Sequence, residues 1–169
     1  IIYTLSKMIF LNKNEKNITK KFLENGYIIF KAENKNSLLE IKKLLLNTIN
    51  KSKTLYKAKI NDLNKIHKKL SINKLNNFRV HVINEINKDK KIRFNYFNIA
   101  RSRLYDLVGN ELMMQKKINL SIQFPNDDSS LLPVHSDVWS GDSPYEINLW
   151  VPMVNCYKSK SMYILPQKK

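Results

Sequence analysis

The chain has 169 residues, of which 43% are hydrophobic, the size and composition of one folded domain rather than of a disordered segment. Its formal net charge is +16, from 26 Lys, 4 Arg and 14 acidic residues, and its glycines form no Walker-type or dinucleotide-type phosphate loop. The single Cys156 excludes an internal disulfide and a cysteine-based zinc site, and it favours a reducing, cytoplasmic location.

The positive charge is concentrated in the first two thirds of the chain. Residues 1–117 hold 26 basic and 9 acidic residues, whereas residues 118–169 hold 4 basic and 5 acidic ones. Because Asn and Ile are also abundant, an AT-rich genome accounts for the excess of Lys, and nucleic acid is not the expected partner. We predict no membrane anchor and no signal peptide, and Met8 is a candidate start of translation.

The front of the chain has the apolar spacing of helices. A first helix is predicted from Asn17 to Asn25, with Gly26 past its end and Phe22 and Leu23 facing the core. A short buried strand is expected at 27–30. Further helices are expected at 36–51, from 61 onward, at 75–87 and at 92–108.

The pattern changes after Lys117 to an alternation of apolar and polar residues. Strands are predicted at 119–124, 131–137, 146–151 and 162–165, with turn-forming residues between them. Short strands at this spacing indicate a sandwich or barrel. The fold class is therefore α+β in a single domain, 1–169, with a mainly helical basic part, 1–117, followed by strands in 118–169.

The residues best suited to chemistry lie in the second predicted strand. His135 and Asp137 are two positions apart, so their side chains are expected on the same face. An imidazole and a carboxylate supply two of the three ligands of a facial iron(II) site, whose third ligand is normally a second His. A structural His–Asp pair has the same spacing. His67 and His81 lie in the helical part and are not expected to reach this site.

The motifs around this pair resemble the phytanoyl-CoA dioxygenase-like family of iron(II)- and 2-oxoglutarate-dependent oxygenases. They comprise a helix–Gly–strand segment at 22–30, the core motif at 132–137, a Trp-containing strand at 147–156 and a strand at 161–166. The sequence His-x-Asp-x-Trp-Ser-Gly-Asp-Ser-Pro from His135 is most similar to a bacterial subgroup found with carbohydrate-biosynthesis clusters. The resemblance covers residues 18–166.

This resemblance implies an N-terminal helical layer packed on an incomplete double-stranded β-helix, a jelly-roll or cupin-like barrel. It implies iron(II) as metal, 2-oxoglutarate as co-substrate, and hydroxylation of a sugar or surface-polysaccharide precursor. His135 and Asp137 match the first two iron ligands. The residues expected near the co-substrate are Trp150, Gln123, Lys158 and Lys160. Those expected near the substrate are Trp139 and Asp142.

The sequence departs from the family pattern at its end. The second His ligand and the Arg or Lys that clamps 2-oxoglutarate are expected beyond Pro166, but the sequence stops at Lys169. The hypothesis is therefore a dioxygenase fragment that lacks the C-terminal part of the barrel. Two alternatives stay open, a basic anion- or nucleic-acid-binding module and an inactive pseudo-enzyme.

Overall fold

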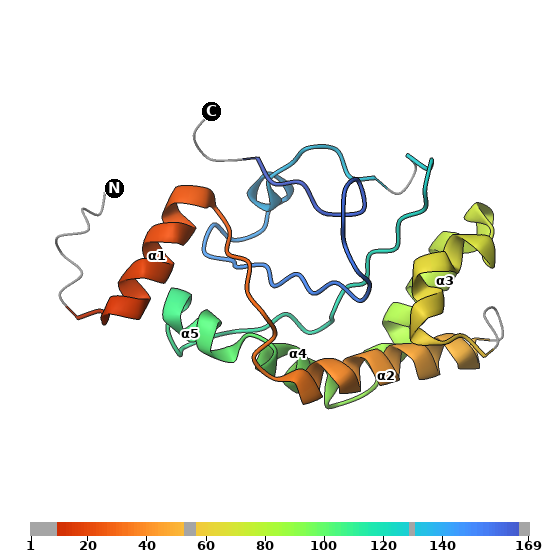
Figure 1. The fold of residues 1–169 in the computed structure, drawn as a ribbon, viewed down its shortest axis with the longest axis horizontal. Coiled ribbons are helices and arrows are strands. Elements are labelled where there is room, and N and C mark those ends of the chain that lie inside the picture. Colours follow the sequence, from red (N-terminus) through yellow and green to blue (C-terminus); the bar gives the residue numbers. More distant parts are fainter. Residues whose placement is uncertain (1–9, 53–56, 129–130, 166–169) are drawn as a thin grey trace.

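The computed structural model describes residues 10–52, 57–128 and 131–165. Five α-helices and two 3₁₀-helices occur in these ranges. They are α1 (Lys13–Asn25), α2 (Lys35–Lys51), η2 (Ile60–Lys68), α3 (Ile72–Ile86), α4 (Ile92–Asn98), α5 (Arg101–Val108) and η3 (Asp137–Ser140). Helix α2 packs against α3 and α4, and α1 packs against α5. The five α-helices form an open arc, and the chain beyond α5 lies along its inner side (Figure 1).

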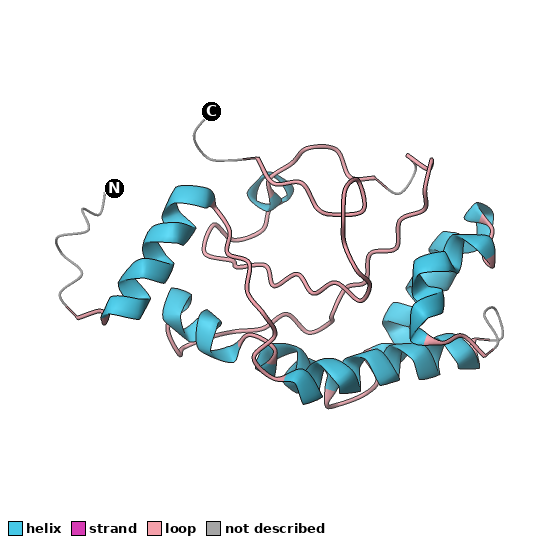
Figure 2. Cartoon of the chain, viewed as in Figure 1, coloured by secondary structure: helices cyan, strands magenta, loops and turns pink. Residues whose placement is uncertain are grey.

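The predicted barrel is wrong, because the described part of the chain contains no β-sheet. Figure 2 shows helices joined by loops, and the segments predicted as strands are irregular. Pairing between β-strands is limited, in the described ranges, to one isolated bridge between Tyr157 and Lys160. The α+β jelly-roll class is therefore replaced by a helical layer that carries a long irregular C-terminal segment.

The alternating segment 119–124 nevertheless keeps its two faces. Leu120, Ile122 and Phe124 are half-buried against the helical core, while Ser121 and Gln123 are exposed. The period-two pattern therefore describes which side chains are covered, but helices cover them and no neighbouring strand does. The apolar–polar pattern is the same whether a helix or a neighbouring strand covers the apolar face, so the pattern does not distinguish the two.

Two apolar clusters form the core. The larger one joins the second half of α2 to α3 through Leu45, Ile49, Phe78, Val82 and other buried residues. The smaller one is made by four isoleucines from α2, the α4 region and the segment after α5: Ile41, Ile92, Ile99 and Ile118. Met153 contacts both clusters. The C-terminal segment is thus fastened to the helical layer at its middle.

The first two helices begin with the side-chain caps that their sequences favour. Asn12 accepts hydrogen bonds from the backbone of Asn14 and Glu15, and the Glu15 carboxylate accepts one from the Asn12 backbone, which completes a capping box. Helix α1 therefore starts earlier than the predicted Asn17. It ends as predicted at Gly26, whose φ of 78° favours glycine. Leu23, expected in the core, is 53% exposed.

The helix predicted over 92–108 is broken between α4 and α5. The break buries Ile99 and Ala100, and Ala100 has a non-helical backbone conformation. The carboxylate of Glu33 accepts hydrogen bonds from the backbone N–H groups of Ser102 and Arg103 at 2.9 and 3.2 Å. This distant side chain caps the start of α5, an interaction that local sequence spacing does not reveal.

Asn87 ties the C-terminal segment to the end of α3. Its amide nitrogen donates to the carbonyl oxygens of Ile83 and Ile118, at 2.7 and 2.9 Å, and its amide oxygen accepts from the Ile118 N–H at 2.8 Å. The side chain thus pairs with both backbone groups of Ile118, as a neighbouring strand would. Because Ile118 is 7% exposed, water cannot easily replace these bonds.

Replacing Asn87 with alanine should lower the free energy of unfolding by about 1–3 kcal/mol, because it leaves buried backbone groups without partners. Urea unfolding followed by circular dichroism measures this change. Asn84 is the matched control, since it is exposed on the same helix and its side chain has, among the described residues, one hydrogen-bond partner, the Lys117 ammonium at 3.5 Å. Its alanine variant should change stability by less than about 0.5 kcal/mol. Equal losses in the two variants would contradict the assigned role of Asn87.

Tyr96 makes a second tie to the C-terminal segment. Its hydroxyl donates a hydrogen bond to the carbonyl oxygen of Leu149, and burial raises the pKa of Tyr96 from 10.0 to about 12. The neutral phenol is therefore favoured in the folded state. Its contribution to stability is fully present below pH 10, the unfolded pKa, and is lost as the pH rises towards 12.

Alkaline unfolding should therefore depend less on pH in the Tyr96→Phe variant than in the wild type between pH 10 and about 12. Denaturant unfolding at a series of pH values measures this difference. The two proteins differ at residue 96 alone, so the comparison isolates the Tyr96 phenol. Parallel curves would show that the Tyr96 phenol titrates alike in the folded and unfolded chain.

None of the helices in the described ranges combines the length and apolar character needed to cross a membrane.

Candidate functional site

A tight turn positions the His-x-Asp motif. His135 follows an irregular segment, and Asp137 opens η3, which ends at Gly141 with a φ of 96°. The Asp142 N–H donates to the Asp137 carbonyl oxygen at 3.2 Å and closes the turn. The strand predicted over 131–137 is thus absent, and backbone curvature rather than strand alternation brings the two side chains together.

The side chains of His135 and Asp137 converge on one point. His135 Nε2 lies 3.5 Å from Asp137 Oδ1, and the side chains are 38% and 44% exposed. Two ligands bound at right angles to one metal ion, with bonds of about 2.1 Å, lie about 3 Å apart. A cation could therefore be shared by this pair after a small adjustment, with its remaining coordination positions open to solvent.

The hydrogen bond on the other ring nitrogen sets the tautomer of His135. Nδ1 lies 2.7 Å from the carbonyl oxygen of Pro133, which can only accept, so Nδ1 carries the proton. In the neutral ring the lone pair is then on Nε2, the atom that faces the Asp137 carboxylate. Two electron-rich atoms face each other, and a metal ion or a second proton between them relieves their repulsion. Histidine ligands in metal sites commonly have such a carbonyl partner.

Asn148 holds the second oxygen of the carboxylate. Its amide nitrogen donates to Asp137 Oδ2 at 2.5 Å, which leaves Oδ1 directed at His135. The residue comes from the segment predicted as the 146–151 strand, eleven positions beyond Asp137. Neither Asn148 nor the Pro133 carbonyl stands out in the sequence as a partner of the motif. The one local signal is that an amide residue, Asn148, follows the motif in the sequence.

Four other residues predicted for the site make no polar contact with the His135 and Asp137 side chains in the described ranges. Trp139 and Asp142 lie in and just after η3, and Trp139 is 77% exposed. Gln123 is exposed on the opposite side of its segment from the core-packed residues, and Trp150 is 47% exposed. No hydrogen bond or ion pair in the described ranges joins any of these four side chains to His135 or Asp137.

Lys158 and Lys160 belong to a separate tight turn. Lys158 has a positive φ of 50°, its carbonyl accepts a hydrogen bond from the Ser161 hydroxyl, and the Lys160 ammonium lies 5.7 Å from the centre of the Tyr157 ring. The structure gives neither lysine a contact with the His–Asp pair. Their predicted role near the co-substrate stays a prediction.

The other two histidines have different surroundings. His67 packs edge-on against Phe124, with ring centres 6.4 Å apart, and His81 lies on the exposed side of α3. Among the residues that the structure describes, no group of three or more His, Cys, Asp or Glu side chains is placed to hold one metal ion. The described part of the site therefore supplies two protein ligands.

Comparison with protein-family models, with curated proteins and with solved structures finds no match for this chain.

Proposed function

We propose that His135 and Asp137 bind iron(II) and that the chain carries this part of the site of a 2-oxoglutarate-dependent dioxygenase. The observation that carries the proposal is the convergence of His135 Nε2 and Asp137 Oδ1, with a hydrogen-bond partner behind each group. Nitrogen and carboxylate donors in this combination suit iron(II) that acts on dioxygen. The substrate class follows the motif resemblance and is a sugar or surface-polysaccharide precursor.

The roles of this chain's residues follow from their positions. His135 offers a lone pair on Nε2, and Asp137 adds one negative charge that partly neutralises the cation. Asn148 keeps the carboxylate oriented. The bound iron(II), with 2-oxoglutarate and dioxygen, would supply the oxidation of the substrate together with the release of succinate and carbon dioxide. Exposed Trp139 and Tyr145 offer apolar surface close to Asp137 in the sequence.

Formation of succinate tests this proposal directly. The protein is loaded with iron(II) without oxygen, then mixed with 2-oxoglutarate and dioxygen, and succinate is measured by NMR. Because the described site supplies two of the three protein ligands, we expect only a small excess of succinate over the level given by free iron(II), and the His135→Ala variant should remove this excess. Metal binding without succinate would instead support the pseudo-enzyme alternative.

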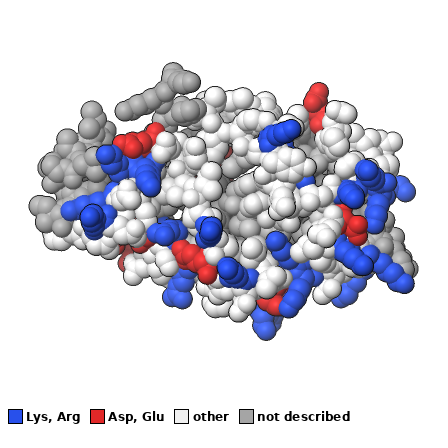
Figure 3. Space-filling view, in the orientation of Figure 1, with Lys and Arg blue, Asp and Glu red and all other residues white. Residues whose placement is uncertain are grey.

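The helices offer a specific observation for a second candidate, a polyanion-binding surface. Lys and Arg side chains gather over the helical layer, while the C-terminal segment is largely uncharged in the same view (Figure 3). Several acids of the helical part already pair with a cation, as Glu24 does with Lys20, Glu40 with Lys43 and Asp62 with Lys69. The other lysines of the helical part therefore give its surface an excess of positive over negative charge. Salt-dependent binding of nucleic acid that survives His135→Ala would favour this candidate.

A further inference from the structure

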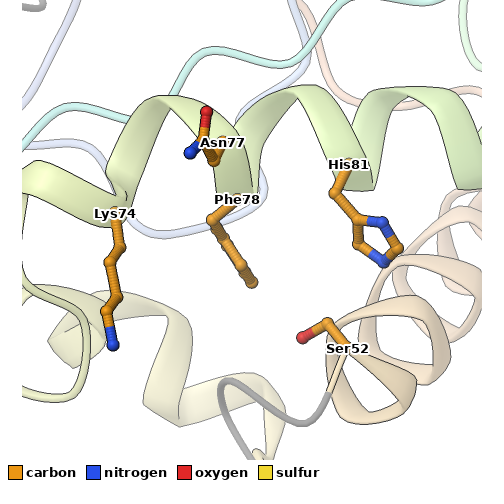
Figure 4. A pocket seen from close by; sticks show the side chains of 5 residues that line it. All are labelled: Ser52, Lys74, Asn77, Phe78 and His81. Atoms are coloured by element: carbon orange, nitrogen blue, oxygen red, sulfur yellow. The ribbon is translucent and has the colours of Figure 1, made fainter.

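A pocket lies between the end of α2 and one face of α3, well away in sequence from the His–Asp pair. Lys74, Asn77, Phe78 and His81 follow one another at helical spacing along α3, and Ser52 faces them from the C-terminal end of α2 (Figure 4). The pocket is open to solvent on one side and has a volume of about 260 Å³. This is slightly below the usual range for pockets that hold drug-sized ligands, about 300–1,000 Å³, so a small molecule suits it.

The wall of the pocket combines an aromatic floor with cationic and hydrogen-bonding groups. Phe78 is 5% exposed and belongs to the larger core cluster, so its ring is held in place. In Figure 4 the Lys74 and His81 side chains reach down on either side of the Phe78 ring. An apolar group placed against Phe78 would thus have an ammonium on one side and an imidazole on the other.

The charges around the pocket favour an anion. No Asp or Glu of the described residues lies within ion-pair distance of Lys74, so its charge is available to a ligand. Glu85 is the nearby acid, one helical turn beyond His81, and it is engaged by Lys88. The hydrogen bond from Lys88, aided by the charges of His81 and Lys51, lowers the pKa of Glu85.

We propose that this pocket binds a small phosphate monoester, with the phosphate at Lys74 and the apolar part of the ligand between the Phe78 and His81 rings. Lys74 supplies the positive charge that the phosphate needs. The site is independent of the proposed iron site, because none of its residues belongs to the His–Asp turn. The His135→Ala variant should therefore bind the monoester as the wild type does.

Histidine ring signals in NMR test the proposal with phenyl phosphate as probe, at constant pH and ionic strength. The chain has three histidines, so His67 and His135 serve as internal references for His81. Phenyl phosphate should shift the His81 signals to saturation and leave the other two nearly unchanged. Inorganic phosphate, which cannot contact Phe78, should bind more weakly at the same site.

Two lysine variants separate a defined pocket from general attraction to a basic protein. Lys74→Gln should weaken phenyl phosphate binding roughly twofold to fivefold, the range expected for one exposed charge pair. Lys16→Gln removes the same charge from α1, at the opposite end of the molecule from α3, and should have no effect (Figure 1). Equal shifts at all three histidines, equal losses in both variants, or equal affinity for the two phosphates would overturn the proposal.

Discussion

Replacing Asp137 with alanine should weaken divalent-metal binding by this chain at least about 100-fold. The basis is that outer hydrogen-bond partners alone are worth about 10–100-fold, and Asp137 is a direct ligand in the proposed site. The carboxylate also supplies the only negative charge shown to face His135 Nε2 in the described ranges. Titration with cobalt(II), followed by its visible absorption, measures the affinity without the oxidation that complicates iron(II).

Two further variants locate the effect at the His–Asp pair. Asp142→Ala removes the same charge from the same turn, but the contact of Asp142 with Asp137 uses its backbone N–H and remains. It should bind cobalt(II) as the wild type does. Asn148→Ala should lose about 10-fold or more, because Asp137 Oδ2 loses its donor. If Asp142→Ala and Asp137→Ala weaken binding equally, the metal is held by general charge and not by this pair.

The helices were the part of the fold that sequence could predict best. The apolar stripe of α2 and the spacing of Phe78, Val82 and Ile86 on α3 placed these elements within a few residues of their bounds. These signals are local, and tertiary packing agrees with them. The break at Ile99–Ala100 was missed because the cap from Glu33 joins residues about seventy positions apart.

The strands were mispredicted for a related reason. Alternation along 119–124 requires that one face be covered, and the side chains of Leu120, Ile122 and Phe124 meet that requirement against helices. A β-strand also needs a second extended segment within hydrogen-bonding distance, and a single-sequence pattern does not specify one. In this chain an asparagine side chain, Asn87, takes the place of that backbone partner at Ile118.

The asparagines likewise show a difference between what the sequence indicated and what the structure contains. Its abundance was attributed to base composition, but several asparagines make structural hydrogen bonds. Asn12 and Asn34 cap α1 and α2, and Asn50 pairs with both backbone groups of Ala58. In the candidate site, the motif drew attention to His135 and Asp137, but the turn that brings them together and the contribution of Asn148 required the three-dimensional structure. Partners that join distant segments leave little trace in local spacing.

The largest effect on stability is expected from Ile49→Ala. Ile49 is 2% exposed and lies in the core cluster that joins α2 to α3. In the described ranges no β-sheet contributes to this core. Its truncation removes buried apolar surface and leaves a cavity that the two helices cannot fully close. Substitutions of this kind cost about 2–5 kcal/mol. Because small domains have about 5–15 kcal/mol in total, this loss is a large fraction of the stability of the fold.

Leu39→Ala is the matched control, since Leu39 occupies the same helix but is 52% exposed. It loses a similar amount of side chain with little change in buried area, so it should cost less than about 1 kcal/mol. Urea unfolding of both variants, followed by circular dichroism, gives the comparison. A core that depends on the α2–α3 contact requires a loss at least twice as large for Ile49→Ala. Similar losses would mean that these helices are held together elsewhere, and that the Phe78 floor of the phosphate pocket is not fixed by the packing described above.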